Sequence, residues 1–136
     1  MPAKKNVRHI ALTGEKIVHD WDLIRELNSS HPVVLIKREL LASDVSLLAL
    51  LNALVIDCTE RCDIESQLLP ALKKWKKGLP GLSVILVDGG LTQEQIAKAF
   101  RSGVKDYFAF PYDFKLLADR IKFLTKRQSS SGDLFS

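Results

Sequence analysis

Long hydrophobic runs are absent from this sequence of 136 residues. No apolar stretch approaches the roughly 18 residues that a membrane span requires. The N-terminal residues Met1 to Lys5 are basic, but no long apolar region follows them. We therefore predict neither a signal peptide nor a membrane anchor, and expect a cytoplasmic protein.

Cysteine is also scarce, since only Cys58 and Cys62 are present. A structural zinc site needs about four ligands, and His9, His19 and His31 are scattered without ligand spacing. The two cysteines are therefore interpreted as reduced thiols rather than as a disulfide or half of a metal site.

Recognisable catalytic groupings are missing as well. The sequence has no Ser-His-Asp or Cys-His grouping, no Gly-rich phosphate loop and no dinucleotide fingerprint, so we do not expect an enzyme.

The net charge is only +4. The lysine cluster from Lys73 to Lys77 stands near the end of a predicted helix, where cations suit the helix dipole. No nucleic-acid motif accompanies this cluster, and we do not expect nucleic acid as a partner.

The composition is that of one globular domain, with 46% hydrophobic and 26% charged residues. We predict an N-terminal extension over residues 1–7, a domain over residues 8–127 and a flexible tail or linker over residues 128–136.

Five apolar runs alternate with five helical patterns along this domain. The expected strands cover residues 9–12, 32–36, 53–56, 83–87 and 104–110. Because the central runs are unbroken rather than alternating, they are typical of strands covered on both faces. The sequence therefore predicts an α/β fold, a three-layer doubly wound five-stranded parallel sheet of the flavodoxin-like class.

The helices carry their own signals. Gly14 is expected to open a helix whose inner face holds Ile17, Trp21, Ile24 and Leu27. A second helix should place Val45, Leu48 and Leu51 inward, and a third should pack Trp75 and begin or kink at Pro70. The expected N-caps are Ser43 or Asp44, Asp63, Thr92 and Asp113.

One stretch resembles a known family. Residues Gly103 to Tyr112 read Gly-Val-Lys-Asp-Tyr-Phe-Ala-Phe-Pro-Tyr, similar to the fifth-strand motif of response regulator receiver domains, the chemotaxis regulator among them. Asp57 closes the third strand, as the family's phosphoacceptor does. The resemblance implies strand order 2-1-3-4-5 and a part in a two-component phosphorelay.

In that family, phosphoryl transfer relies on an acidic pair that holds Mg²⁺, a hydroxyl and a lysine. Such a transfer is catalysed by positioning and by charge neutralisation. Here Thr13 and Gly14 stand where the acidic pair belongs, and Glu15 follows one position late. Glu15 and Asp57 are the candidate ligands if Mg²⁺ binds.

The remaining positions of the family pattern are also changed. Asp88 stands at the hydroxyl position, where a negative charge repels phosphate, and Phe110 replaces the lysine. Tyr107 matches the switch aromatic, although it also fits as a packed tyrosine. Charge-assisted contacts to phosphate contribute about 1.5–3 kcal/mol each, so phosphorylation at Asp57 is expected to be impaired or absent.

These observations predict a pseudo-receiver that signals by binding a protein. The resemblance implies a binding surface over the fourth helix, fifth strand and fifth helix, made basic by Lys98, Arg101, Lys105, Lys115 and Lys122, with a homodimer as one outcome. Two alternatives stay open: an active Mg²⁺-dependent phosphoacceptor, and a small-molecule binder that uses the strand tips. Asp57 and Asp88 also suggest an acid/base pair or a cation site, against the simpler interpretation that Asp57 is a relic and that Asp88 points to solvent.

Overall fold

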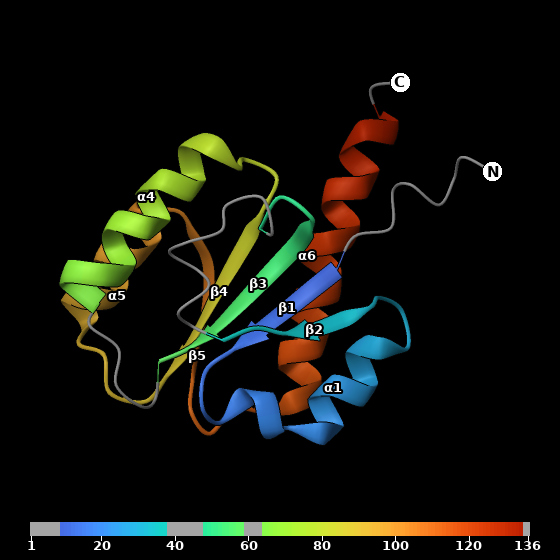
Figure 1. Cartoon of the computed structure of the whole chain (residues 1–136), viewed down its shortest axis with the longest axis horizontal. Helices are drawn as coiled ribbons and strands as arrows, with labels where there is room; N and C mark the ends of the chain where they lie inside the picture. Colours follow the sequence, from blue (N-terminus) through green and yellow to red (C-terminus); the bar gives the residue numbers. More distant parts are fainter. Residues whose placement is uncertain (1–8, 38–47, 59–63, 135–136) are drawn as a thin grey trace.

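The computed structural model describes residues 9–37, 48–58 and 64–134. Its centre is a parallel sheet of five strands in the order β2-β1-β3-β4-β5 (Figure 1). The predicted fold class and strand order are therefore confirmed. The strands are β1 (His9–Thr13), β2 (Val33–Leu35), β3 (Leu51–Asp57), β4 (Ser83–Asp88) and β5 (Val104–Ala109).

Helices cover both faces of this sheet. The helical elements are η2 (Ile17–His19), α1 (Trp21–Asn28), η3 (Ile64–Leu68), α4 (Leu69–Gly78), α5 (Gln93–Arg101) and α6 (Phe114–Leu134). In Figure 1, α4 and α5 lie side by side on one flank, and α1 lies beside α6 on the other. The chain therefore forms three layers.

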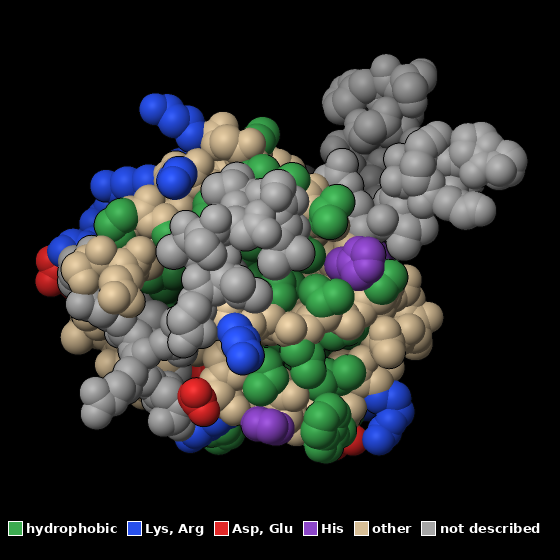
Figure 2. All heavy atoms as spheres, viewed as in Figure 1, with side chains coloured by type: hydrophobic (Ala, Val, Ile, Leu, Met, Phe, Trp, Pro, Cys, Tyr) green, Lys and Arg blue, Asp and Glu red, His purple; other side chains and the backbone are tan. Residues whose placement is uncertain are grey.

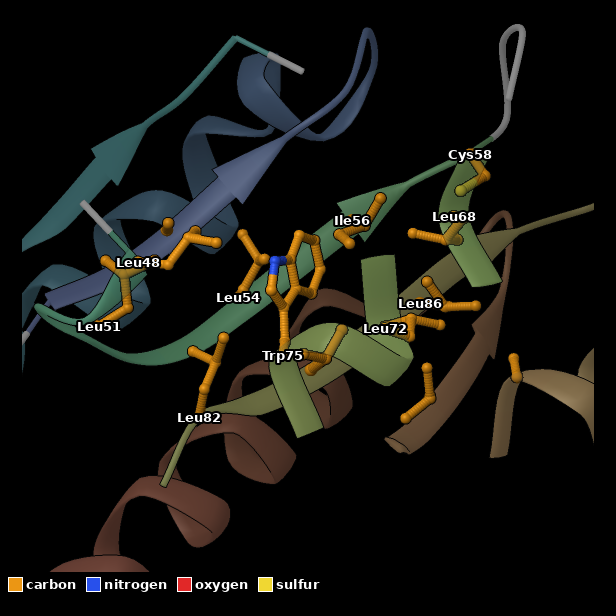
Figure 3. Close-up of a cluster of buried hydrophobic side chains, with 14 of the residues drawn as sticks. Leu48, Leu51, Leu54, Ile56, Cys58, Leu68, Leu72, Trp75, Leu82 and Leu86 are labelled. Atoms are coloured by element: carbon orange, nitrogen blue, oxygen red, sulfur yellow. The ribbon is translucent and has the colours of Figure 1, made fainter. Parts of the chain in front are cut away.

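Two hydrophobic clusters hold these layers together. The first contains Leu54 and Ile56 of β3 together with Leu72 and Trp75 of α4 (Figure 3). The second contains Ala53 and Val55 of β3 with the inward residues of α1 and α6. Because successive strand residues point to opposite faces, one apolar run in β3 supplies both clusters. This explains why the central runs of the sequence do not alternate with polar residues.

The start of α1 differs from the prediction. Asp20 is the N-cap, and its Oδ1 accepts a hydrogen bond from the Leu23 backbone N–H at 3.0 Å. Leu23 and Leu27, four residues apart, therefore form the buried side. The expectation that Trp21 packs inward is wrong, since its side chain is 61% exposed. Trp75, in contrast, is buried as predicted.

The second predicted helix falls mostly outside the described residues. Leu51 does not belong to it, because Leu51 is the first residue of β3. Leu48 and Leu51 nevertheless lie in the same buried cluster. Three expected caps, Ser43, Asp44 and Asp63, and the inward residue Val45 lie outside the described residues.

The later helix signals are confirmed. Pro70 lies in the first turn of α4, directly after the π-helical turn η3, so the regular α-helix starts next to the proline, as the sequence predicts. Thr92 and Gln95 form the capping box of α5. Asp113 accepts backbone hydrogen bonds from Lys115 and Leu116 at the start of α6.

The last helix extends beyond the predicted domain boundary. α6 continues to Leu134, so the structure places helix over residues 128–134, where the sequence predicts a flexible tail. The division into extension, domain and tail itself stays a prediction. Within the described residues, no helix combines the length and apolar character needed to cross a membrane.

Candidate functional site

Asp57 is the last residue of β3, the central strand of the sheet. It therefore lies at the carboxyl edge, between the ends of β1 and β4, where ligands of open α/β sheets bind. Its residue surface is only 1% exposed. The geometry of the surrounding loops decides what this carboxylate can do.

The loop after β1 uses the carboxylate as a hydrogen-bond acceptor. Asp57 Oδ2 accepts from the Lys16 N–H at 3.0 Å and from the Ile17 N–H at 2.8 Å. These N–H groups belong to the beginning of η2, where helical turns leave donors unpaired. Asp57 thus satisfies the first turn of η2 from a distant strand, in the way that a cap residue does locally.

Gly14 brings the same loop into direct contact with Asp57. Its φ is +128°, a conformation that side chains rarely adopt. A Cβ at this position would overlap Asp57 Cβ and would lie 2.5 Å from the Asp57 carbonyl oxygen. The loop backbone therefore covers the carboxylate, and only glycine permits this approach.

Thr13 occupies one of the positions where the receiver family carries its acidic pair. Its side chain is fully buried, and its Oγ1 has no hydrogen-bond partner among the described residues. A buried hydroxyl without a partner costs stability and supplies no negative charge. Thr13 therefore does not supply the negative charge that a carboxylate would bring to a metal site.

Glu15 differs from Asp57 in exposure and in the cavity that it lines. Its side chain is exposed, and it lines a cavity of about 670 Å³ with Val18, Trp21 and Leu35. The described residues contain no group of three His, Cys, Asp or Glu side chains that could hold a metal ion. Mg²⁺ requires octahedral oxygen ligation, and the residues here do not fit it. The assignment of Glu15 and Asp57 as ligands stays a prediction that this geometry disfavours.

Of the two cysteines that we predict to be reduced thiols, only Cys58 lies within the described residues. Cys58, which directly follows Asp57, is a buried cysteine, whereas Cys62 lies outside the described residues. The Cys58 backbone N–H donates to the Val87 carbonyl at 2.8 Å, which extends the pairing of β3 with β4.

Asp88 is buried, so the expectation that it points to solvent is wrong, and its carboxylate bonds within its own turn. Its Oδ1 accepts a short hydrogen bond from the Gly90 N–H, and its backbone carbonyl accepts from the Tyr107 hydroxyl at 2.7 Å and the Phe110 N–H at 3.0 Å. Both Asp57 and Asp88 thus accept backbone N–H groups. This arrangement supports a structural role for each carboxylate rather than an acid/base pair.

Phe110 fills the lysine position with an aromatic contact. Its ring packs edge-on against Tyr112, with centroids 5.8 Å apart. The Lys16 Nζ lies 4.8 Å from the centre of the Phe110 ring, a cation–π contact. A cation therefore does reach this edge, but it comes from the loop after β1. Sequence reasoning missed Lys16, whose side chain matches no family position.

Both tyrosines near the site hold their protons strongly. Burial, with the nearby Asp88 carboxylate, raises the pKa of Tyr107. Burial and a hydrogen bond to Asp20 raise the pKa of Tyr112 well above its ordinary value. The Tyr112 hydroxyl donates to Asp20 Oδ2 at 2.7 Å. Tyr112, also missed from sequence, thus ties the loop before α6 to the N-cap of α1.

Comparisons with known proteins agree with this architecture. No family model matches the sequence, and no curated protein matches it. Among solved structures, a receiver domain protein from Methanospirillum hungatei is 17% identical with a TM-score of 0.71, covering 93% of this chain and 99% of that one. The CheY-like protein TadZ from Pseudomonas aeruginosa is 26% identical with a TM-score of 0.69, covering 88% and 99%.

An atypical orphan response regulator is also similar, at 18% identity and a TM-score of 0.68, covering 87% of this chain and 95% of that one. The chain has the receiver fold. Its structural neighbours are CheY-like receiver domains, orphan regulators among them, so the resemblance seen in the sequence is confirmed.

Proposed function

We propose that this chain is a receiver-like signalling domain that works without phosphorylation of Asp57. One observation carries the proposal: Asp57 is 1% exposed, and its carboxylate accepts two backbone hydrogen bonds from the loop after β1. A phosphoacceptor has to present an oxygen to a donor and to Mg²⁺. In this chain, the Asp57 carboxylate instead binds the backbone of the loop after β1.

The replaced residues support the same conclusion. Asp88 adds negative charge where the receiver family carries a hydroxyl, and Phe110 replaces the fixed cation. One structural neighbour, the atypical orphan regulator, is described as having a phosphorylation-independent regulatory mechanism. We infer a mechanism of that kind for this chain.

Incubation with Mg²⁺ and acetyl phosphate tests the proposal, with intact mass as the measurement. We expect no mass increase by one phosphoryl group, because the loop covers Asp57 and because Phe110 stands in place of the family's lysine. Beryllofluoride with Mg²⁺ should likewise leave the melting temperature unchanged. An adduct that forms on the native chain and is lost in Asp57→Asn would instead establish the alternative, an active phosphoacceptor.

We further propose that the surface over α5, β5 and α6 binds the protein partner. Phe100 of α5 and Leu116 and Phe123 of α6 are large apolar side chains that are 43%, 62% and 47% exposed. Leu116 and Phe123 are seven residues apart, so they lie on one side of α6. Arg120 between them pairs with Asp106 of β5 at 2.7 Å, which links the helix to the edge strand.

The basic residues expected on this surface divide into three groups. Lys98 pairs with Glu94 on its own helix at 4.0 Å, and Lys122 bonds Glu26 of α1 at 2.9 Å. Arg101 and Lys115 are exposed and suit an acidic partner. Lys105 lines a cavity at the opposite edge of the sheet from Asp57.

A second copy of the chain is a partner that can be tested directly. We expect the average mass in light scattering to rise with concentration, and Leu116→Glu/Phe123→Glu to abolish the rise by placing charges in a buried contact. Leu35→Glu/Leu50→Glu, two exposed leucines elsewhere, is the matched control. An equal effect of both double variants would contradict an interface at α6.

A further inference from the structure

A second cavity, of about 280 Å³, lies where α4 ends and where β4 and β5 begin. It is therefore at the amino edge of the sheet, opposite the edge that holds Asp57. Its lining comes from α4, from the loop before β4 and from the start of β5: Leu72, Trp75, Lys76, Leu79, Pro80, Leu82, Val84, Gly103 and Lys105. It is independent of the proposed function.

The inner wall of this cavity is apolar. Trp75, Leu82 and Val84 are buried core residues, and Figure 3 shows Trp75, Leu72 and Leu82 in the cluster under α4. The volume is slightly below the 300–1,000 Å³ typical of small-molecule sites. It suits one large apolar side chain better than a cofactor.

The rim of the cavity is basic. Lys76 of α4 and Lys105 of β5 are both exposed, and within the described part of the chain neither has an ion-pair partner. Among the described residues, no acidic side chain lines the cavity. An occupant with negative charge beside an apolar group would therefore complement it.

A simpler explanation accounts for only part of this arrangement. Lysines in the last turn of a helix complement the helix dipole, which explains Lys76 and Lys77 at the end of α4. It does not explain Lys105, which comes from a strand, and it does not explain an apolar hollow between the two rim lysines.

The positive charge also extends beyond the rim. Lys73, Lys74 and Lys77 are exposed on α4, and Figure 2 shows Lys and Arg side chains gathered over the flank where Figure 1 places this helix. The helix rises about 1.5 Å per residue, so these charges span roughly 6 Å along α4 before Lys105 is added. Such a spread favours an extended acidic segment over a compact anion.

We propose that this lysine-rimmed cavity binds an acidic segment of a partner protein, with one apolar side chain of that segment in the cavity. The carboxylates of the segment pair with Lys76, Lys105 and the exposed lysines of α4. The apolar side chain displaces water from the wall formed by Trp75 and Leu82. This site would give the domain a second protein contact, apart from the surface over α5, β5 and α6.

Trp75 provides a direct readout, because it lines the cavity and the chain has only one other tryptophan, Trp21. In a Trp21→Phe background, the emission of Trp75 should change as a synthetic peptide with one Phe between runs of Glu is added. Replacing the peptide Phe by Ala should weaken binding about tenfold, the effect of losing a central apolar anchor.

Lys76→Ala/Lys105→Ala should weaken binding of the same peptide about tenfold, since two ion pairs at the rim are lost. Arg25→Ala/Lys37→Ala removes the same charge elsewhere on the surface and should leave the affinity within about twofold. Circular dichroism confirms that both variants are folded.

Three results would overturn the proposal. The first is no change in Trp75 emission at millimolar peptide. The second is an affinity that depends on total charge alone, so that both double variants or the Phe and Ala peptides behave alike. The third is tighter binding of phosphatidylserine vesicles or of a DNA duplex through Lys76 and Lys105, which would make the site a membrane or nucleic-acid contact.

Discussion

Single residues at the carboxyl edge show how a phosphoacceptor pocket can be converted into structure. Asp57 is still a carboxylate, but its Oδ2 accepts hydrogen bonds from the Lys16 and Ile17 N–H groups. These belong to the loop that carries the metal-binding acidic pair in the receiver family. Thr13 keeps the position of an acidic residue, but its hydroxyl is buried and has no hydrogen-bond partner in the part of the chain that the structure describes. The Asp57 carboxylate therefore stabilises the fold, whereas the buried Thr13 hydroxyl destabilises it.

Thr13→Val should therefore stabilise the protein. Valine has nearly the same shape, and the change removes a buried hydroxyl that no described group satisfies, so we expect a gain of about 1 kcal/mol in the free energy of unfolding. Urea unfolding followed by circular dichroism measures it. Thr125→Val is the matched control, because the buried Thr125 hydroxyl donates to the Lys122 carbonyl at 3.0 Å and its removal should destabilise. A loss in both variants would contradict this account of Thr13.

At the scale of helices and strands, the sequence pattern predicted most of the features that depend on neighbouring residues. The apolar runs of the strands, the capping box at Thr92 and the helix start near Pro70 each follow from signals within a few residues. The strand order, in contrast, came from the resemblance to the receiver family. Trp21 is exposed rather than buried because the helix starts at the Asp20 cap and not at Gly14, and the turn η2 lies between them. That shift rotated the predicted inner face of α1.

The closure over Asp57 was beyond sequence reasoning for a different reason. The groups that contact the carboxylate are the backbone N–H groups of Lys16 and Ile17, which every residue except proline carries. Side-chain types at positions 13–15 indicated only that a metal site was degraded. They did not indicate that the same loop folds onto the aspartate.

Gly14→Ala tests this closure at the level of the loop. A Cβ at Gly14 would meet the Asp57 side chain and carbonyl, and its φ of +128° is unfavourable for alanine. We expect a loss of more than about 2 kcal/mol in the free energy of unfolding. Gly78→Ala at the end of α4 is the control, since nothing lies within 4 Å of its added Cβ. A loss at Gly14 no larger than at Gly78 would show that the loop is not held against Asp57.

At the scale of the whole molecule, the two sides of the carboxyl edge are joined by tyrosines. Tyr107 bonds the Asp88 carbonyl and so connects β5 to the end of β4. Tyr112 bonds Asp20 across a sequence separation of 92 residues and so connects the loop before α6 to α1. These two hydroxyls, with Asp57, make the edge a network of loops fastened to one another.

This network predicts how the protein responds to alkaline pH. Tyr107 and Tyr112 are the only tyrosines of the chain, and both have a pKa raised above the ordinary value near 10. Because folding raises each pKa, the stability that the two hydroxyls contribute is present below pH of about 10 and is lost as the pH rises beyond it.

In an ultraviolet titration, the phenolate signal of the native protein should therefore appear at higher pH than in urea, together with the loss of helical circular dichroism. Tyr112→Phe should retain a delayed signal of about half the amplitude from Tyr107 and should lose stability, since Asp20 loses a hydrogen bond to a partly buried charge. Ionisation of either tyrosine near pH 10 while the circular dichroism remains intact would mean that its hydroxyl is not held by the carboxyl edge.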